Sequence, residues 1–514
     1  MIVDYNNIEK RYKYTFFSTL IIGFLTHGMA LVNVFSIHDN VGCLFNRGGG
    51  LGSGRWLISV ISQVNTHLFG TSEFSTPFIN GILALIFIAI SSCILVWLLD
   101  IKRLLYCMFI GGILVTFPTI VTLFGYMFTA DIYMLSFALA ILGAVLICKY
   151  QNRKQWLLGI ILLASSVGIY QAFIPVIMSV TLLYLMKMSL EDDFTWENFY
   201  KEILKLTVSY IFFMAVYLLM TKFFLYIFSY QLTTYKGANA VSLSPLDYFM
   251  RIPVAYKTFI MPNNKPEVFF LYGTIRYAYT LLLVFTALLS AYVIKIQSNK
   301  KRISCIAFTT LLFLLPLCLN FMYVMCPDEI INSLLQIFGI VFLFIYNIWL
   351  LQILSSHRNF VFKIVKFANI TILLFLIVSF WRLDNFCYLK AKYIQQQAIS
   401  YFTNMASMIK NTDGYKDTMP VVFYGQSNIA DRSIKEIPEF ELVSVVPYFD
   451  LNRFVNDYSN LYFMHQWCGY APDVVEEYDT LQHKKELSLM PSFPSHGSIR
   501  INNDTIYVKL GELN

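Results

Sequence analysis

The chain has 514 residues, of which 57% are hydrophobic and 13% are charged, and its net charge is +7. A water-soluble domain carries about a quarter charged residues, so this composition excludes a soluble globular protein and indicates a polytopic membrane protein. The basic residues form no dense stripe along the chain, so we expect no nucleic-acid partner.

Apolar segments of about 20 residues recur along the first three quarters of the chain, each long enough to cross a hydrocarbon core of about 30 Å as a helix. The first segment follows Lys10, Arg11 and Lys13, and no small-residue cleavage pattern comes after it, so we expect an uncleaved helix. We expect about eleven transmembrane helices, near residues 14–36, 77–99, 104–123, 128–148, 155–169, 172–187, 205–229, 269–294, 303–324, 330–354 and 366–386.

The distribution of positive charge predicts the topology. If 155–187 is two short helices that meet at Tyr170 and Gln171, and the N-terminus lies inside, eighteen Lys and Arg residues fall in inner loops and six in outer loops. One long helix would instead place the basic run 295–302 outside. The charge bias therefore favours two helices, and it puts the loops 37–76 and 230–268 on the outer face.

The part of the chain beyond the last span has a different character. It contains 15 of the 31 acidic residues in about a quarter of the chain, and it carries short strand-like runs at 421–424 and 505–508. We therefore expect a transmembrane domain over 1–387 and a small soluble α/β domain over 388–514 on the outer face. In the first outer loop, 55–72 is predicted to form an amphipathic surface helix.

Two acidic residues are candidates for catalysis. Asp39 follows the first span, where a carboxylate meets both a lipid-borne donor and a water-borne acceptor, so it is a candidate general base. His38 and Asn40 flank it and suit the polar contacts that keep its charge available. Asp131 lies near the outer edge of the fourth span, where an acid is rare. The alternative for both is structural: an ordinary loop aspartate or a cap at the membrane interface.

Lys222 and Arg276 fall in the outer third of consecutive spans. Two cations at one depth suit a lipid phosphate, although snorkelling to the interface explains them equally well. Tyr170 and Gln171, at the predicted helix reversal, either line a sugar pocket or satisfy the backbone groups that are freed there.

The glycine-rich stretch 48–54 is not predicted to bind nucleotide phosphates, because it has no GxGxxG register and Arg55 stands where a P-loop requires Lys. Arg55 and Trp56 instead suit the lipid interface. The nine cysteines form no CxxC pair and no metal-ligand spacing, so the sequence predicts no dedicated metal site.

Three motifs in a fixed order carry a resemblance to a known family. They are His38-Asp39-Asn40 followed by Ser53-Gly54-Arg55-Trp56, then Phe124-Gly125-Tyr126 with Thr129-Ala130-Asp131, then Gly168-Ile169-Tyr170-Gln171-Ala172-Phe173. Over about residues 14–180 the chain resembles the Gtr-type serotype-converting glucosyltransferases of bacteria and their phages. Beyond that region only the layout is similar.

The resemblance implies a GT-C-like fold in the bacterial cytoplasmic (inner) membrane, with the site on the outer face of the lipid bilayer. It implies a polyprenyl-phosphate-linked sugar donor, such as undecaprenyl phosphate carrying glucose, and transfer to a surface polysaccharide such as the O-antigen of lipopolysaccharide. It also implies that Asp39 is the catalytic base, and it points to Asp131.

The expected chemistry is a single inverting displacement that needs no nucleotide and no cofactor, while a divalent metal stays open. The residues expected to contact the substrates are His38, Asn40, Arg55, Trp56, Tyr170 and Gln171, with Lys222 and Arg276 at the donor phosphate.

Two other readings of the sequence remain. A flippase for lipid-linked sugars would show repeat-related halves and helices broken near mid-membrane, whereas the polar candidates here gather at the outer surface. An O-antigen polymerase or ligase would also use an outer site and a lipid-phosphate donor, and only the order of the motifs argues against it.

Overall fold

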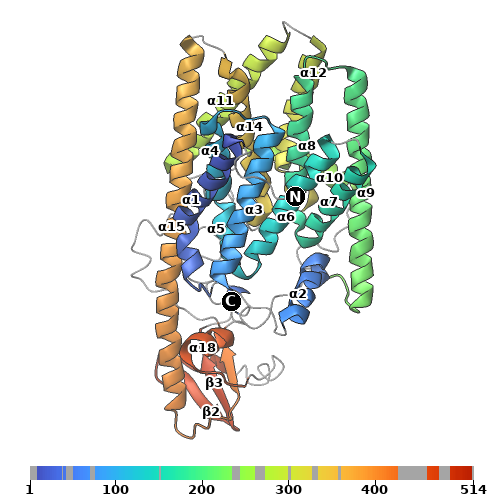
Figure 1. The fold of residues 1–514 in the computed structure, drawn as a ribbon. Helices are drawn as coiled ribbons and strands as arrows, with labels where there is room; N and C mark the ends of the chain where they lie inside the picture. Colours follow the sequence, from blue (N-terminus) through green and yellow to red (C-terminus); the bar gives the residue numbers. More distant parts are fainter. Residues whose placement is uncertain are drawn as a thin grey trace. The chain divides into compact units, whose positions relative to one another are not determined.

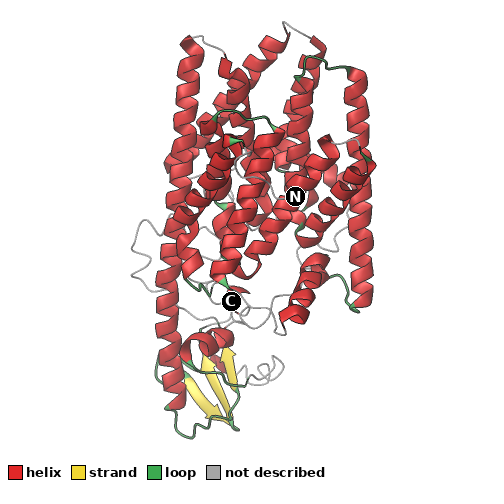
Figure 2. Ribbon diagram, viewed as in Figure 1, coloured by secondary structure: helices red, strands yellow, loops and turns green. Residues whose placement is uncertain are grey.

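The computed structural model divides into two compact units. Unit 1 comprises Met1–Val32 and Arg47–Asn385, and unit 2 comprises Asn33–Asn46 and Phe386–Asn514. The structure describes residues 9–36, 39–41, 50–69, 76–149, 152–233, 244–260, 273–298, 302–326, 334–356, 360–425, 460–473 and 487–511. Among these residues, unit 1 is built of helices and unit 2 carries the strands (Figures 1 and 2).

The helices of unit 1 follow the apolar segments of the sequence. They are α1 (Lys10–Val32), η3 (Leu51–Ser53), α2 (Trp56–Phe69), α3 (Pro77–Leu98), α4 (Leu104–Thr116), α5 (Thr119–Phe124), α6 (Met127–Lys149), α7 (Arg153–Ile169), η4 (Gln171–Phe173), α8 (Ile174–Ser189), α9 (Trp196–Ile227), α10 (Pro245–Ile260), α11 (Gly273–Ser298), α12 (Arg302–Leu319), α13 (Met322–Met325), η9 (Leu334–Ile340), α14 (Val341–Ile353) and η10 (Leu354–Ser356). The last helix of the span region, α15 (Phe360–Lys410), begins in unit 1 and ends in unit 2.

Nine helices in the described part of the chain are long and apolar enough to cross a membrane. The apolar helix α4, with 13 residues, and the 17-residue helix α7 occupy the positions of the other two expected spans. The chain is therefore a mostly helical, polytopic membrane protein, as the composition indicates. The number of crossings stays a prediction.

The chain reverses between α7 and α8, which confirms two helices in 155–187. Tyr170 is extended (φ −152°, ψ 112°), and α8 has a proline in its first turn, where its missing N–H costs nothing. Contacts near the end of α8 and the start of α7 agree with this reversal. Lys187 Nζ, in the last turn of α8, donates to Leu98 O at the end of α3 at 2.9 Å. Lys205 Nζ, in α9, donates to Cys148 O, shortly before α7, at 3.1 Å.

Close packing of α1 on α3 and α4 depends on glycine. A Cβ atom at Gly111 would clash with Thr19 Oγ1, and one at Gly23 would lie 2.7 Å from Leu85 Cδ2. Small residues let apolar helices approach closely in a membrane, where no hydrophobic force draws them together.

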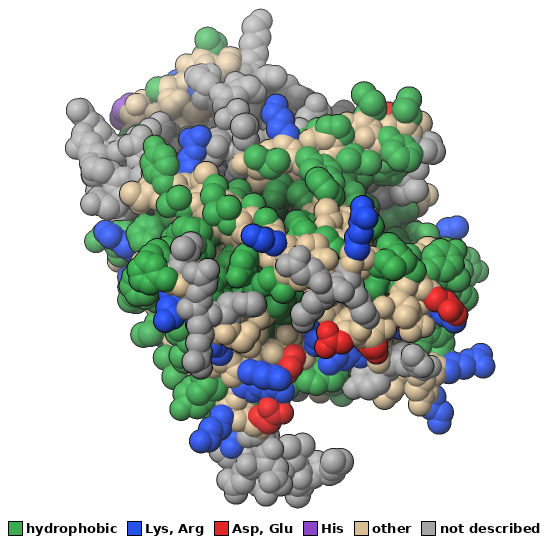
Figure 3. All heavy atoms as spheres, turned by 90° about the horizontal axis from the view of Figure 1, so that it is seen from above, with side chains coloured by type: hydrophobic (Ala, Val, Ile, Leu, Met, Phe, Trp, Pro, Cys, Tyr) green, Lys and Arg blue, Asp and Glu red, His purple; other side chains and the backbone are tan. Residues whose placement is uncertain are grey.

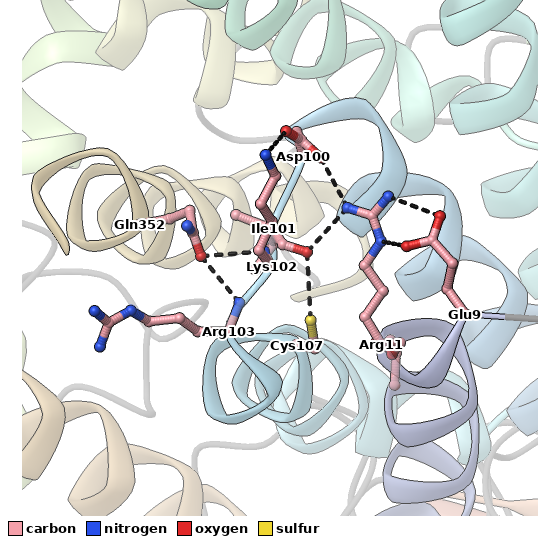
Figure 4. Close-up of polar contacts among 9 residues, drawn as sticks. Glu9, Arg11, Asp100, Ile101, Lys102, Arg103, Cys107 and Gln352 are labelled. Carbon is pink, nitrogen blue, oxygen red and sulfur yellow. Dashed lines mark hydrogen bonds and ion pairs between the residues drawn. The ribbon is translucent and has the colours of Figure 1, made fainter. Parts of the chain in front are cut away.

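An ion-paired network closes the end of unit 1 at which α1 and α4 begin (Figure 4). Arg11 Nη1 and Asp100 Oδ1 are 2.8 Å apart, and Lys102 Nζ lies 3.1 Å from Asp100 Oδ2. Gln352 Oε1 accepts from the backbone N–H groups of Lys102 and Arg103. Figure 3 looks onto this end, where Lys and Arg side chains lie beside Asp and Glu side chains. The network fixes the turn between α3 and α4 against α1 and α14.

Unit 2 contains a three-stranded sheet in the order β1-β3-β2. Strand β1 (Val421–Tyr424) pairs in parallel with β3 (Thr505–Lys509), and β2 (Ile499–Asn502) pairs antiparallel to β3. Asn503 and Asp504 both have positive φ, as the two-residue hairpin turn between β2 and β3 requires. Strands β1 and β3 lie where the sequence predicts them, whereas β2 is not predicted. Within its described residues, unit 2 also contains α18 (Asn460–Cys468) and the end of α15.

The boundary between the units falls at 385/386, two residues from the predicted boundary at 387/388. The segment Asn33–Asn46 belongs to unit 2. From the sequence, its outer-loop part is expected in the transmembrane domain, because a chain segment between two spans is ordinarily part of the domain that contains them.

Candidate functional site

A tight turn ahead of α2 presents Arg55. The backbone N–H of Arg55 donates to Gly50 O at 3.0 Å, and that of Gly54 donates to Leu51 O at 2.9 Å. Gly54 has φ +75°, and a Cβ atom there would lie 2.7 Å from Tyr217 Oη. Both the backbone conformation and the close approach of α9 therefore require glycine at this position.

The half-buried Arg55 guanidinium lies on an aromatic pair. Its Nη1 donates to Tyr133 Oη at 3.1 Å, and its Cζ is 4.9 Å from the centroid of the Tyr170 ring. The two tyrosine rings stack on each other, with centroids 4.7 Å apart. Tyr133 comes from α6 and Tyr170 from the reversal between α7 and α8, so these elements together set the position of the positive charge.

Gln171 fastens the turn to the helices around it. Its Nε2 donates to Ser53 O at 2.7 Å and to Tyr217 Oη at 3.1 Å. Trp56 is buried and stacks on Phe224 of α9, with ring centroids 5.2 Å apart. The turn is therefore held from η4 and α9 together.

Four predicted site residues are thus brought together in unit 1, with two that the sequence analysis missed. A tyrosine in an apolar span carries no local signal of function, so nothing in the sequence singled out Tyr133 or Tyr217. We define the Arg55 cluster as Arg55, Trp56, Tyr133, Tyr170, Gln171 and Tyr217.

Asp131 lies in α6 two residues before Tyr133, at the same end of that helix. It is half-buried, and its Oδ1 accepts from Asn80 Nδ2 at 3.3 Å. Asn80 is itself held by Met127 O and Thr76 Oγ1. The carboxylate is therefore positioned by polar contacts between α3 and α6.

Asp39 and Asn40 belong to unit 2, where they lie in the short 3₁₀ turn 39–41. Asn40 is buried, and its Nδ2 donates to Phe35 O. Phe35 in turn stacks on Tyr388 of α15. His38 lies outside the described residues.

The chain just before Asp39 is tied to α15 by Gln395. The Nε2 of Gln395 donates to Val34 O at 2.8 Å, while its Oε1 accepts the backbone N–H of Ser36 at 3.0 Å. Ser36 Oγ also accepts from Trp467 Nε1 at 2.7 Å. One buried side-chain amide therefore satisfies the backbone carbonyl of Val34 and the backbone N–H of Ser36.

The structure does not bring Lys222 and Arg276 together. Both are exposed, and they come from helices with different neighbours: α9 packs on α7, α6 and α2, whereas α11 packs on α12 and α14. Figure 1 draws the two helices on opposite sides of unit 1. Each cation stays a separate prediction for the donor phosphate.

No three His, Cys, Asp or Glu side chains gather at a metal-binding distance in the part of the chain that the structure describes. The residues of the Arg55 cluster are donors and aromatic rings, which suit hydroxyl, sugar-ring and phosphate groups better than a cation.

Comparison with known families shows the class of protein: a glucosyltransferase. The family model described as glucosyl transferase GtrII matches residues 28–346, which is more than half of the chain. The chain belongs to the GtrII glucosyl transferase family, and the predicted resemblance is confirmed. No curated protein and no solved structure shows a significant similarity to it.

Proposed function

We propose that this glucosyltransferase moves glucose from a polyprenyl-phosphate donor to a hydroxyl of a bacterial surface polysaccharide such as O-antigen. The proposed site lies on the outer face of the cytoplasmic membrane, and the proposed fold is GT-C-like. The observation that carries the proposal is the Arg55 cluster, in which donors and aromatic rings from four separate stretches of unit 1 converge.

The chemistry of the cluster suits a glucosyl group. A guanidinium donates hydrogen bonds to sugar hydroxyls, and the tyrosine pair supplies flat apolar faces beside a pyranose ring. Gln171 and Tyr217 hold the turn so that Arg55 is preorganised before the substrate arrives.

In the proposed reaction, Asp39 takes the proton of the acceptor hydroxyl as general base. The acceptor oxygen forms a bond to the anomeric carbon while the bond from that carbon to the phosphate oxygen breaks, so the configuration inverts. The electron pair leaves with the polyprenyl phosphate, whose stable anion needs no general acid. Asp131 is the second candidate acid.

The decisive experiment mixes the purified protein with polyprenyl-phosphate glucose and a lipid-linked oligosaccharide. We expect transfer by the unaltered protein, near-complete loss in Asp39→Asn, and no loss in Asp413→Asn, a control at an exposed aspartate of unit 2. Transfer that survives Asp39→Asn removes the base assignment. Movement of the labelled donor across vesicles without any transfer would favour a flippase, and joining of whole repeat units would favour a polymerase or ligase.

A further inference from the structure

Helix α10, in the predicted outer loop 230–268, is amphipathic and lies against the other helices along one side. Ala255 and Phe259 are 0% and 6% exposed, whereas Leu246, Phe249 and Met250 on the other side are 67%, 68% and 70% exposed. In a membrane protein such an apolar side faces lipid chains.

Polar contacts fasten the C-terminal half of α10 in place. Asn320 Nδ2 donates to Ala255 O and to Thr258 Oγ1, both at 3.2 Å. Tyr256 Oη donates to Phe313 O of α12 at 2.6 Å. These bonds fix the rotation of α10, and therefore fix which of its side chains face α12 and α13.

Arg251 lies one helical turn before Ala255, on the side that faces these helices. Its Nη1 is buried and has no hydrogen-bond partner within the described ranges, and no described acidic residue forms an ion pair with it. Burial raises the pKa of the Cys326 thiol and the positive charge of Arg251 opposes that rise, so the guanidinium lies near the end of α13. A buried guanidinium nitrogen without an acceptor is costly unless an anion completes it.

We propose that Arg251 binds the phosphate of the lipid donor, with the prenyl chain along the exposed apolar side of α10. This inference rests on the proposed function and names a phosphate-binding residue within it. A guanidinium matches phosphate geometry with paired donors, and the adjoining apolar side chains favour a lipid over a free anion. Phe313 of α12, 70% exposed, extends the apolar surface beside Tyr256.

The test compares Arg251→Gln with Lys257→Gln, which removes an exposed cation from the same helix. Because a charge-assisted hydrogen bond is lost, we expect Arg251→Gln to raise KM for polyprenyl-phosphate glucose by about tenfold or more. The KM for the acceptor stays unchanged, Lys257→Gln leaves both values unchanged, and Arg251→Lys recovers part of the loss. Equal donor KM values in Arg251→Gln and Lys257→Gln would overturn the assignment.

Inhibition distinguishes the sources of the phosphate. Sugar-free polyprenyl phosphate inhibits the unaltered protein and inhibits Arg251→Gln about tenfold more weakly, whereas inorganic phosphate at the same concentration inhibits neither. Inhibition by inorganic phosphate that Arg251→Gln abolishes would mean that a free anion is the ligand, and would overturn the lipid assignment.

A charge exchange tests whether an acidic residue of this chain, and not the lipid phosphate, forms an ion pair with Arg251. Asp328 and Glu329 follow Cys326 closely in the sequence and lie outside the described residues. Recovery of the donor KM by Arg251→Glu combined with Glu329→Arg or Asp328→Arg would overturn the proposal. Absence of transfer from any polyprenyl-phosphate sugar by the unaltered protein is a separate outcome, which removes the proposed function. Binding of polyprenyl phosphate to the purified protein then still tests Arg251.

Discussion

Gln171 Nε2 donates a hydrogen bond to the backbone carbonyl of Ser53 at 2.7 Å, which joins the reversal between α7 and α8 to the turn ahead of α2. The same nitrogen donates to Tyr217 Oη, so three stretches of unit 1 meet at one side-chain amide. The direction of the Arg55 guanidinium depends on that junction, because Arg55 follows Ser53 by two residues.

Gln171→Ala is expected to lower the rate of glucosyl transfer by about tenfold, because two hydrogen bonds worth about 1 kcal/mol each are lost and the turn is released. Tyr217→Phe removes only one of them and should cost less. Transfer rates and thermal unfolding of both variants are the measurements. An equal loss in the two variants would show that the bond to Ser53 does not matter.

Arg55→Lys keeps the charge but loses the planar group that lies over Tyr170. We expect a transfer rate lower by about tenfold or more, and a similar or larger loss in Arg55→Gln, because the guanidinium geometry carries the interaction. Steady-state kinetics with the glucose donor measure this. Full activity of Arg55→Lys would show that charge alone suffices there.

Gln395→Leu leaves the backbone groups of Val34 and Ser36 without their partner, at a cost of about 1–3 kcal/mol for each unsatisfied buried group. If Asp39 is the base, transfer should fall together with faster amide exchange in the segment 33–41. The matched control is Gln396→Leu, at the exposed neighbouring position, which should change neither reading. Faster exchange with full activity would separate Asp39 from catalysis.

The ion pair at Asp100 predicts a pH dependence of stability. Partial burial disfavours the charged carboxylate, but hydrogen bonds from Arg11 and Lys102 outweigh it, so the pKa of Asp100 is lowered from its ordinary 3.8. A lowered carboxyl pKa stabilises the fold above the unfolded-state value, and the stabilisation is lost as pH falls through the folded-state value.

Asp100→Asn measures that contribution, and asparagine tolerates the positive φ of this position. Solvent screens the partly exposed pair, so we expect a difference of about 1 kcal/mol or less near neutral pH. Thermal unfolding should show a constant difference between pH 5 and pH 8 that shrinks at about pH 3. A difference that persists undiminished at the lower pH would contradict the assignment.

Several features of this protein follow from its sequence alone because they are local. Hydrophobic length gives the membrane class, and the distribution of Lys and Arg residues predicts the reversal between two short helices, which the structure places at Tyr170. Short strand-like runs locate β1 and β3. The ordered motifs around Asp39, Asp131 and Tyr170 are sufficient to indicate the family that the comparison shows.

Only the tertiary structure decided which distant residues meet. Tyr133 is 78 residues from Arg55 in the sequence, and Tyr217 is 46 residues from Gln171, yet each pair is hydrogen-bonded. Gln395 is hydrogen-bonded to Ser36 across 359 residues. Lys222 and Arg276 separate for the same reason. Position along a span predicts the depth of a side chain, but helix neighbours and helix rotation decide what it touches, and those follow from packing over the whole fold.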